Sequence, residues 1–397
     1  MRKMAFWLAP NEAVLVISCI LMIIGAVNIF SASFVLAAEL MNNSYYFLLQ
    51  YGKSFAIGLV GFLAVVRLGY RRLAAVTPLI ILTTIALLAA VLLFGEDANG
   101  AKRWLRVGLK FQPSELAKLT VILMNAVHLG GRLERRLPIS LISLPMGVTL
   151  LFGGLVMLQP DMGTAAVIVG LGVAMHLIAG VSRKEIIGLA FTGTTVVTYF
   201  VFAAAYRADR IWAWLDPWSY QQGIGYQSVQ ALLAIGSGGL LGAGFGKGSS
   251  KFYYLPEAHT DFAFAVLCQE QGFIGALVVA GLLAGIGFYG IKIALDARDW
   301  QGTLLATGVI VLILGQAVGN IAMVCGLIPV TGVPLPFISY GGTSLLINLL
   351  ALAFLISVGR YRKRPQASDE EEPEPPPRPR LSLISRTSSE FPQKRQY

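Results

Sequence analysis

The stretch that decides the fold is AVLVISCILMIIGAVNIFSASF, residues 13–34. It holds no charged residue and is long enough for a helix that crosses about 30 Å of hydrocarbon. A signal peptide has a shorter apolar region followed by a small-residue cleavage site, and neither feature is found here. The stretch therefore predicts a retained membrane helix close to the N-terminus.

The whole chain continues this pattern. Of its 397 residues, 56% are hydrophobic and only 13% are charged, with a mean hydropathy of +0.69. A soluble domain carries about 25% charged residues, so the composition excludes an ordinary cytosolic enzyme. Open strands cannot satisfy their backbone groups in lipid, which favours an all-α polytopic membrane protein. The ten expected spans are residues 13–34, 46–66, 76–94, 114–129, 139–157, 164–180, 186–206, 262–290, 304–327 and 343–359.

Charge distribution predicts the orientation of these spans. With the N-terminus in the cytosol, most Arg and Lys clusters fall in cytoplasmic segments, as the positive-inside rule requires. Both ends are then cytoplasmic: residues 1–12 precede a transmembrane domain of residues 13–360, and a tail of residues 361–397 comes after it. The tail is rich in Glu, Pro and Ser and is expected to be disordered. Residues 207–261 form a long extracytoplasmic loop between the seventh and eighth spans.

Several other site classes are excluded. The net charge of +10 is spread between apolar spans, which argues against nucleic-acid binding. The three cysteines and three histidines are scattered, so no zinc site is expected. The glycine-rich residues 236–247 fail the phosphate-loop register and no strand precedes them, so no nucleotide site is expected. Close approach to a ligand and a tight re-entrant turn both stay open for this segment.

Two predicted external segments carry more cations than the orientation rule allows. They hold Lys102, Arg103, Arg106 and Lys110 in residues 95–113, and Arg207, Arg210, Lys247 and Lys251 in the long loop. Clustered cations at an outward membrane face suit an anionic headgroup such as a diphosphate. Ordinary interfacial snorkelling explains them about as well.

Acidic groups near the same face are further candidates. Glu115 and Lys118 share a helix face about one turn inside the surface if Pro113 begins the helix, and they fit either a functional pair or a structural ion pair. Asp261 ends the long loop where the eighth span begins. As a helix N-cap, Thr260 or Asp261 would have a purely local role, which is the more frequent case. Ionised at a helix start, Asp261 could instead accept a proton; Glu257 is a second candidate.

Five motifs, in order along the chain, carry a family resemblance. They are Gly100-Ala-Lys-Arg-Trp-Leu-Arg-Val-Gly108, Phe111-Gln-Pro-Ser-Glu-Leu-Ala-Lys118, Gln159-Pro-Asp-Met-Gly-Thr164, Pro256-Glu-Ala-His-Thr-Asp-Phe262 and Pro334-Leu-Pro-Phe-Ile-Ser-Tyr-Gly-Gly342. Together they resemble the SEDS family (shape, elongation, division and sporulation). The segments at Tyr206-Arg207 and residues 247–256 look closer to its division-type members than to its elongation-type members. Gln269 stands where the family usually has a glutamate, and Glu270 comes next.

The resemblance implies a peptidoglycan glycosyltransferase that polymerises lipid II at the outer face of the cytoplasmic membrane, with a class B penicillin-binding transpeptidase and other divisome membrane proteins as partners. The essential family carboxylate maps onto Asp261, the expected general base. Substrate-binding candidates are Lys102, Arg103, Glu115, Lys118, Arg207, Arg210, Glu257, His259, Ser339 and Tyr340. No organic cofactor is expected, and a divalent cation, Mg²⁺ or Mn²⁺, is a candidate. The alternatives are an elongation-type polymerase, a lipid II flippase and a non-catalytic scaffold.

Overall fold

The structure is a computed structural model. It describes residues 9–98, 101–107, 109–202, 205–249 and 254–361, and the predicted tail lies outside this part of the chain. The chain divides into two units, Met1–Arg362 and Lys363–Tyr397. The described helices and strands all belong to the first unit.

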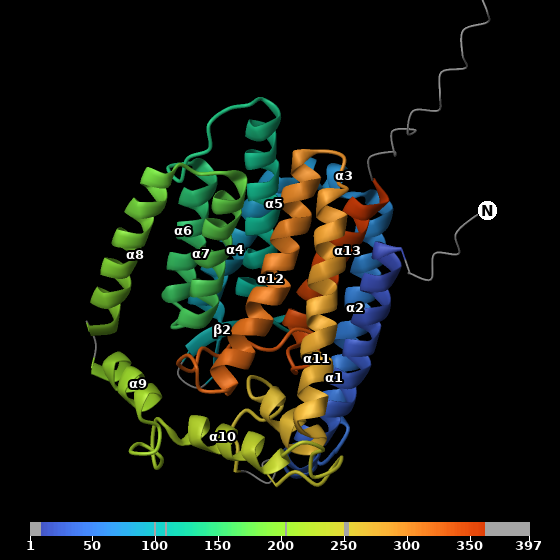
Figure 1. Ribbon diagram of the computed structural model, residues 1–397, viewed down its shortest axis with the longest axis vertical. Coiled ribbons are helices and arrows are strands. Elements are labelled where there is room, and N and C mark those ends of the chain that lie inside the picture. The colour runs from blue at the N-terminus through green and yellow to red at the C-terminus, as the bar shows by residue number, and fades with distance from the viewer. Residues whose placement is uncertain (1–8, 99–100, 108, 203–204, 250–253, 362–397) are drawn as a thin grey trace, which may run out of the picture. The chain divides into compact units, whose positions relative to one another are not determined.

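Helices dominate the described residues (Figure 1). They are α1 (Pro10–Met41), α2 (Tyr46–Leu68), α3 (Tyr70–Ala75), α4 (Thr77–Phe94), α5 (Pro113–Glu134), α6 (Leu144–Met157), α7 (Met162–Ala179), α8 (Arg183–Phe202), α9 (Ala205–Leu215), α10 (Tyr226–Gly238), α11 (Ala263–Leu295), α12 (Trp300–Val324) and α13 (Gly342–Arg360). Three short strands, β1 (Glu96–Ala98), β2 (Ala101–Val107) and β3 (Leu109–Phe111), complete the described elements.

A described helix overlaps each of the ten predicted spans, so the prediction of an all-α polytopic membrane protein is confirmed. Seven of the described helices are long and apolar enough to cross a membrane: α1, α2, α4, α7, α11, α12 and α13. Helix α6 is apolar but shorter. The number of crossings and the orientation with both ends in the cytosol stay predictions.

The segment between α4 and α5 departs from the all-helical expectation. Its strands form a small antiparallel sheet in the order β1-β2-β3. Glu96 faces Trp104, and Leu105 faces Phe111. Polar and apolar residues do not alternate regularly in β2, but Trp104 and Val107 are of types that favour strands. Strand β2 of this sheet contacts α4 and α5.

Burial separates central helices from peripheral ones. In the most apolar 18-residue window, 78% of α13 is buried but only 22% of α4. Polar side chains join the helices where they pack: Asn28 on α1 donates to the Ala263 carbonyl at 2.9 Å, and the hydroxyls of Thr84 and Thr120 join α4 to α5 at 2.9 Å. Small polar groups of this kind hold membrane helices together where lipid offers no hydrophobic drive.

The glycine-rich segment packs against the backbone of α11. Helix α11 is interrupted at Gly272, whose φ of 67° is left-handed. The amides of Ala243 and Gly244 donate to the carbonyls of Gln269 and Glu270 at 2.9 and 3.1 Å. A side chain at Gly242 would collide with the Glu270 carbonyl. The glycines therefore serve close backbone packing around the break in α11.

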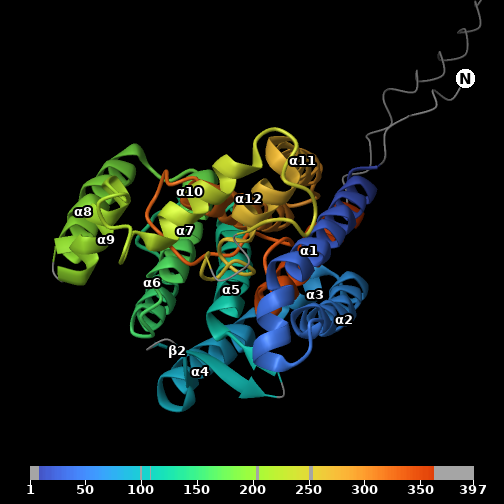
Figure 2. The ribbon, with the colours of Figure 1, turned by 90° about the horizontal axis from the view of Figure 1, so that it is seen from below.

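The proline- and glycine-rich residues 329–341 are irregular, as predicted, and residues 335–339 are buried in the protein interior. Phe337 and Ile338 are 2% and 0% exposed. Tyr51 on α2 donates its hydroxyl to the Phe337 carbonyl at 3.1 Å, and Gly25 on α1 allows the same carbonyl to approach. Protein contacts thus replace the water that this backbone lacks at membrane depth. Figure 2 views the bundle along its helices, with α1, α11 and α12 close together.

The contact between α7 and this segment gives a test of the packing. A Cβ at Gly163 would collide with the Thr331 carbonyl, whereas a Cβ at Gly170, on the same helix, meets open space. Gly163→Ala should therefore lower stability by about 1–3 kcal/mol through overpacking. Gly170→Ala should leave it unchanged or slightly raised, since alanine favours a helix. Thermal unfolding of the purified protein in detergent measures both; equal midpoints would contradict this packing.

Candidate active site

Asp261 lies in the turn immediately before α11, which begins at Ala263. The N-cap position is Phe262 and no side chain caps the helix, so the N-cap prediction for Thr260 or Asp261 is wrong. The Thr260 hydroxyl instead donates to the Glu257 carboxylate at 2.8 Å. The turn folds back before the helix starts, since the amide of Phe262 donates to the Glu257 carbonyl at 3.2 Å. The Asp261 carboxylate is therefore not used for local capping.

Asn320 on α12 holds the backbone around this carboxylate. Its side-chain amide donates to the carbonyls of Asp261 at 2.7 Å and Val333 at 2.8 Å, and it is fully buried. It thus joins the turn before α11 to the irregular residues 329–341. Gly332, with a φ of 72°, lies so close that a Cβ there would be 3.5 Å from Asp261 Oδ2. Asn320 was not among the predicted site residues, because the sequence gives no sign of which partner an asparagine inside an apolar span will meet.

The Asp261 carboxyl is half-buried and receives no hydrogen bond from the residues that the structure describes. Burial raises its pKa to about 7, and the negative charges of Glu257 and Asp161 contribute to this rise, while the Arg103 guanidinium opposes it. A carboxyl group with a pKa near the operating pH and no protein donor can accept a proton. The structure thereby brings together three of the predicted residues: Asp261, Glu257 and Arg103.

Arg103 reaches this site from β2 and is fixed by backbone carbonyls. Its guanidinium donates to the carbonyl of Gln159 at 3.4 Å and to that of Pro160. Asp161, the next residue, caps α7, accepting from the Thr164 amide at 3.1 Å and from the Gln112 side chain at 3.3 Å. Asp161 lies in one of the five sequence motifs but was not among the predicted site residues. Its place just before an apolar helix was the available signal.

His259 and Tyr340 form an aromatic wall with Phe47 of α2. Ring centroids of Phe47 and His259 are 4.5 Å apart, and those of Phe47 and Tyr340 are 5.1 Å apart. Burial lowers the pKa of His259, so its ring is neutral at pH 7. Ser339 has a local role, because its hydroxyl accepts the Leu335 amide at 2.9 Å and stabilises the turn.

Glu115 and Lys118 form an ion pair at 2.7 Å, with side chains only 5% and 2% exposed. Pro113 begins α5, as predicted. The pair is almost completely enclosed, and no described contact joins it to Asp261. Breaking such a pair would leave a buried charge unpaired.

The remaining predicted cations are Lys102, Arg207 and Arg210. Lys102 on β2 and Arg210 on α9 are exposed, and no described contact joins either to Asp261. Arg207 also lies in α9, but its side chain is outside the part that the structure describes. Among the described residues, no group of three or more His, Cys, Asp or Glu side chains is arranged to hold a metal ion. The divalent cation stays a prediction.

Comparison with known proteins identifies the family. The model of the cell cycle protein family that includes FtsW, RodA and SpoVE matches residues 11–364. The chain belongs to this family. A probable peptidoglycan glycosyltransferase FtsW of Geobacter sp. (strain M18) is 37% identical, over 87% of this chain and 95% of its own length. Stage V sporulation protein E of Bacillus subtilis is 36% identical, over 89% and 98%.

Solved structures of the family share the fold. One chain belongs to a peptidoglycan synthase complex in which polymerisation and crosslinking are coordinated; it has a TM-score of 0.75 and 28% identity, covering 90% of this chain and 100% of that one. The rod shape determining protein RodA of Thermus thermophilus has a TM-score of 0.65 and 30% identity, covering 90% and 99%. This family member is thus a multi-pass membrane protein.

The charges around Asp261 predict a pH dependence. A base with a pKa of about 7 is ionised above that pH, so activity should fall as the pH drops below 7. Glu257→Gln removes a negative charge, lowers the pKa of Asp261 and should move this acid limb to lower pH. Arg103→Gln removes a positive charge and should move it to higher pH. Initial polymerisation rates against pH measure both; shifts in the same direction would contradict the assignment.

Asn320 should affect activity by holding Asp261 in position rather than by contacting the reacting atoms. Asn320→Ala removes both hydrogen bonds to the Asp261 and Val333 carbonyls and leaves Asp261 misplaced. Each lost bond to a buried carbonyl costs about 1–3 kcal/mol, so kcat should fall by one decade or more with little change in KM. Asn320→Asp keeps the shape but loses the donor. An unchanged kcat in both variants would exclude a positioning role.

Proposed function

We propose that this protein joins the disaccharide units of lipid II into glycan strands at the outer face of the bacterial cytoplasmic membrane, with Asp261 as general base. The observation that supports this proposal most directly is the half-buried Asp261 carboxyl, which has a pKa of about 7 and receives no hydrogen bond from the described residues. Family membership supports the reaction, because the similar FtsW proteins are named peptidoglycan glycosyltransferases.

The proposed reaction is a displacement at an anomeric carbon. Asp261 takes the proton of the GlcNAc 4-hydroxyl of one lipid II molecule. The oxygen attacks C1 of the MurNAc of the other, the bond from C1 to the diphosphate oxygen breaks, and undecaprenyl diphosphate leaves with inversion. One base suffices, because a diphosphate needs charge stabilisation more than protonation as it leaves.

Cations supply that stabilisation. Arg103 is the best placed, because its charge already acts on Asp261 while backbone carbonyls fix its guanidinium. Arg207 and Arg210 on α9, and Lys102 on β2, are further candidates on the same external segments. The enclosed Glu115–Lys118 pair supports the start of α5 rather than the diphosphate. A divalent cation, Mg²⁺ or Mn²⁺, stays a further candidate for stabilising the leaving diphosphate.

The proposed setting is the division septum, with a class B penicillin-binding transpeptidase and other divisome membrane proteins as partners. The similar FtsW relatives support the division role, and the peptidoglycan synthase complex among the structural neighbours supports a transpeptidase partner. An elongation-type polymerase differs in partner and site of action, not in chemistry. A flippase or a scaffold would not need a poised base.

Polymerisation by purified protein tests the proposal. The protein, alone and with its transpeptidase, is incubated with labelled lipid II, and glycan ladders are resolved on gels. Asp261→Asn should reduce polymerisation at least about 100-fold, the usual contribution of a general base. Asp209→Asn is the matched control, since this exposed carboxylate on α9 lies in the same loop. Near-normal ladders from Asp261→Asn would exclude the base assignment, and lipid II scrambling in liposomes without ladders would favour a flippase.

A further inference from the structure

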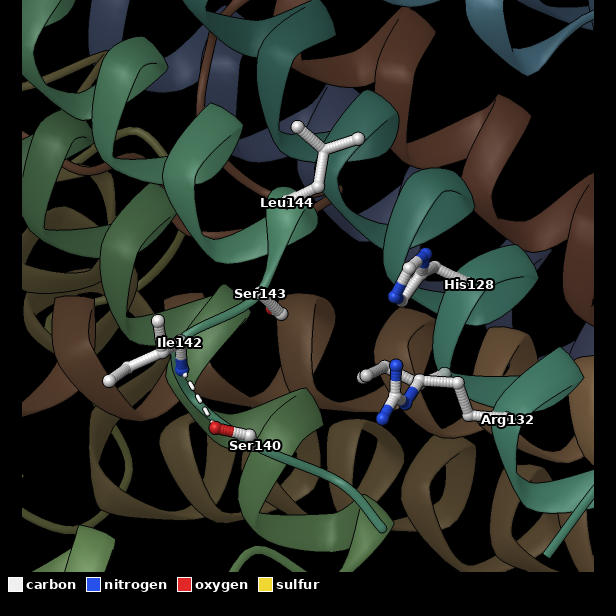
Figure 3. Close-up of a pocket in the computed structure, with 7 residues that line it drawn as sticks. His128, Arg132, Ser140, Ile142, Ser143 and Leu144 are labelled. Carbon is white, nitrogen blue, oxygen red and sulfur yellow. Dashed lines mark hydrogen bonds between the residues drawn. The ribbon is translucent and has the colours of Figure 1, made fainter. Parts of the chain in front are cut away.

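A cavity lies where α5 ends and α6 begins, far from Asp261. It has a volume of about 220 Å³. His128 and Arg132 line it from α5, and Ser140, Ile142, Ser143 and Leu144 line it from the segment that leads into α6. Figure 3 shows the nitrogen atoms of His128 and Arg132 facing across the cavity toward that segment. The cavity therefore combines an imidazole and a guanidinium group with two hydroxyl groups.

Some hydrogen-bond donors in this cavity have no acceptor among the described residues. Arg132 donates Nε and Nη2 to the Pro138 carbonyl at 3.0 and 2.7 Å, which leaves Nη1 without a partner in the part of the chain described. His128 makes no hydrogen bond with any described residue. Ser143 is set in place by His176, whose Nε2 lies 2.9 Å from its hydroxyl oxygen. A guanidinium fixed on one edge and open on the other suits a phosphate oxygen.

The position of the cavity indicates which phosphate compound would reach it. Arg132 is about 28 Å along α5 from Pro113, at a helical rise of 1.5 Å per residue. Since Gln112 contacts Asp161, the cavity lies at the opposite end of α5 from the candidate active site, as Figure 1 shows. Apolar side chains stand exposed beside it: Ile142 is 95% exposed and Leu144 77%. Such side chains at a helix end suit contact with acyl chains at the membrane boundary.

We propose that this cavity binds the phosphate of an anionic phospholipid in the leaflet opposite to Asp261, with acyl chains over Ile142 and Leu144. Residues 132–136 and 183–185 hold five cations against two carboxylates: Arg132, Arg135, Arg136, Arg183 and Lys184 against Glu134 and Glu185. Glu185 is engaged, because it accepts the Leu141 amide at 2.6 Å and so fixes the lining segment. This site is separate from glycosyl transfer and does not depend on it.

Lipid titration of the full-length protein in detergent tests the site, with native mass spectrometry as readout. Phosphatidylglycerol should bind at least about tenfold more tightly than phosphatidylcholine, and Arg132→Gln should weaken it about tenfold, as expected for one lost hydrogen bond to a charged group. His128→Leu should weaken it as well, because leucine has no N–H to donate to a phosphate oxygen. This variant removes no hydrogen bond described in the fold, so it guards against a structural effect of changing Arg132. Arg135→Gln is the matched control, with the same charge lost outside the cavity.

Three outcomes would overturn the proposal. Equal affinity for the two lipids would exclude recognition of headgroup charge. Equal weakening by Arg132→Gln and Arg135→Gln would indicate diffuse attraction rather than a site. Displacement of phosphatidylglycerol by inorganic phosphate at similar concentration would make this a free-phosphate site, without a role for the acyl chains. Because binding is measured without lipid II, the result is independent of the polymerisation assay.

Discussion

Everything at the candidate active site depends on one constraint: irregular backbone at membrane depth must be satisfied by protein. Two irregular segments, the turn before α11 and residues 329–341, meet at the Asn320 side chain, which donates to a carbonyl of each. Tyr51 and Gly25 hold the second segment from α2 and α1. Helices far apart in the sequence thus fix the position of a single carboxylate, Asp261.

This arrangement lowers the stability of the folded protein but gives Asp261 a pKa suited to accepting a proton. Burial raises the pKa of Asp261 to about 7, so the folded protein holds this proton more tightly than the unfolded chain does. The group therefore costs stability as the pH rises from its ordinary pKa toward 7, and that cost is fully present above 7. Arg103 limits the cost with a nearby positive charge, while Glu257 and Asp161 add to it. Active sites commonly retain such unfavourable charges because the reaction needs them.

Local patterns in the sequence were enough to predict the helical framework. Apolar length identified the helices, Pro113 marked the start of α5, and spacing paired Glu115 with Lys118. The motif containing Asp261 was recognised, but a helix cap was the more frequent interpretation of its position, and the early turn at Glu257 was not visible in the sequence. The small sheet carrying Arg103 was missed because β2 shows no regular alternation of polar and apolar residues.

Contacts between residues that lie far apart in the sequence could not be predicted. The partnership of Asn320 with Asp261 joins α12 to the long loop, and nothing local to either residue indicates the other. For the glycine-rich residues 236–247, the sequence left both approach to a ligand and a tight turn open, and the structure shows that this segment contacts the α11 backbone around Gly272. A glycine in the sequence can indicate that a side chain would not fit at that position, but only the structure shows which neighbouring atoms leave no room.

The central claim is that burial keeps the Asp261 carboxyl protonated until near neutral pH. An infrared titration of the purified protein, comparing the native chain with Asp261→Asn, measures this directly through the carbonyl stretch of a protonated carboxylic acid. The account predicts a band in the native chain that disappears on titration near pH 7 and is absent from the variant. A carboxyl that is fully ionised well below neutral pH would contradict it.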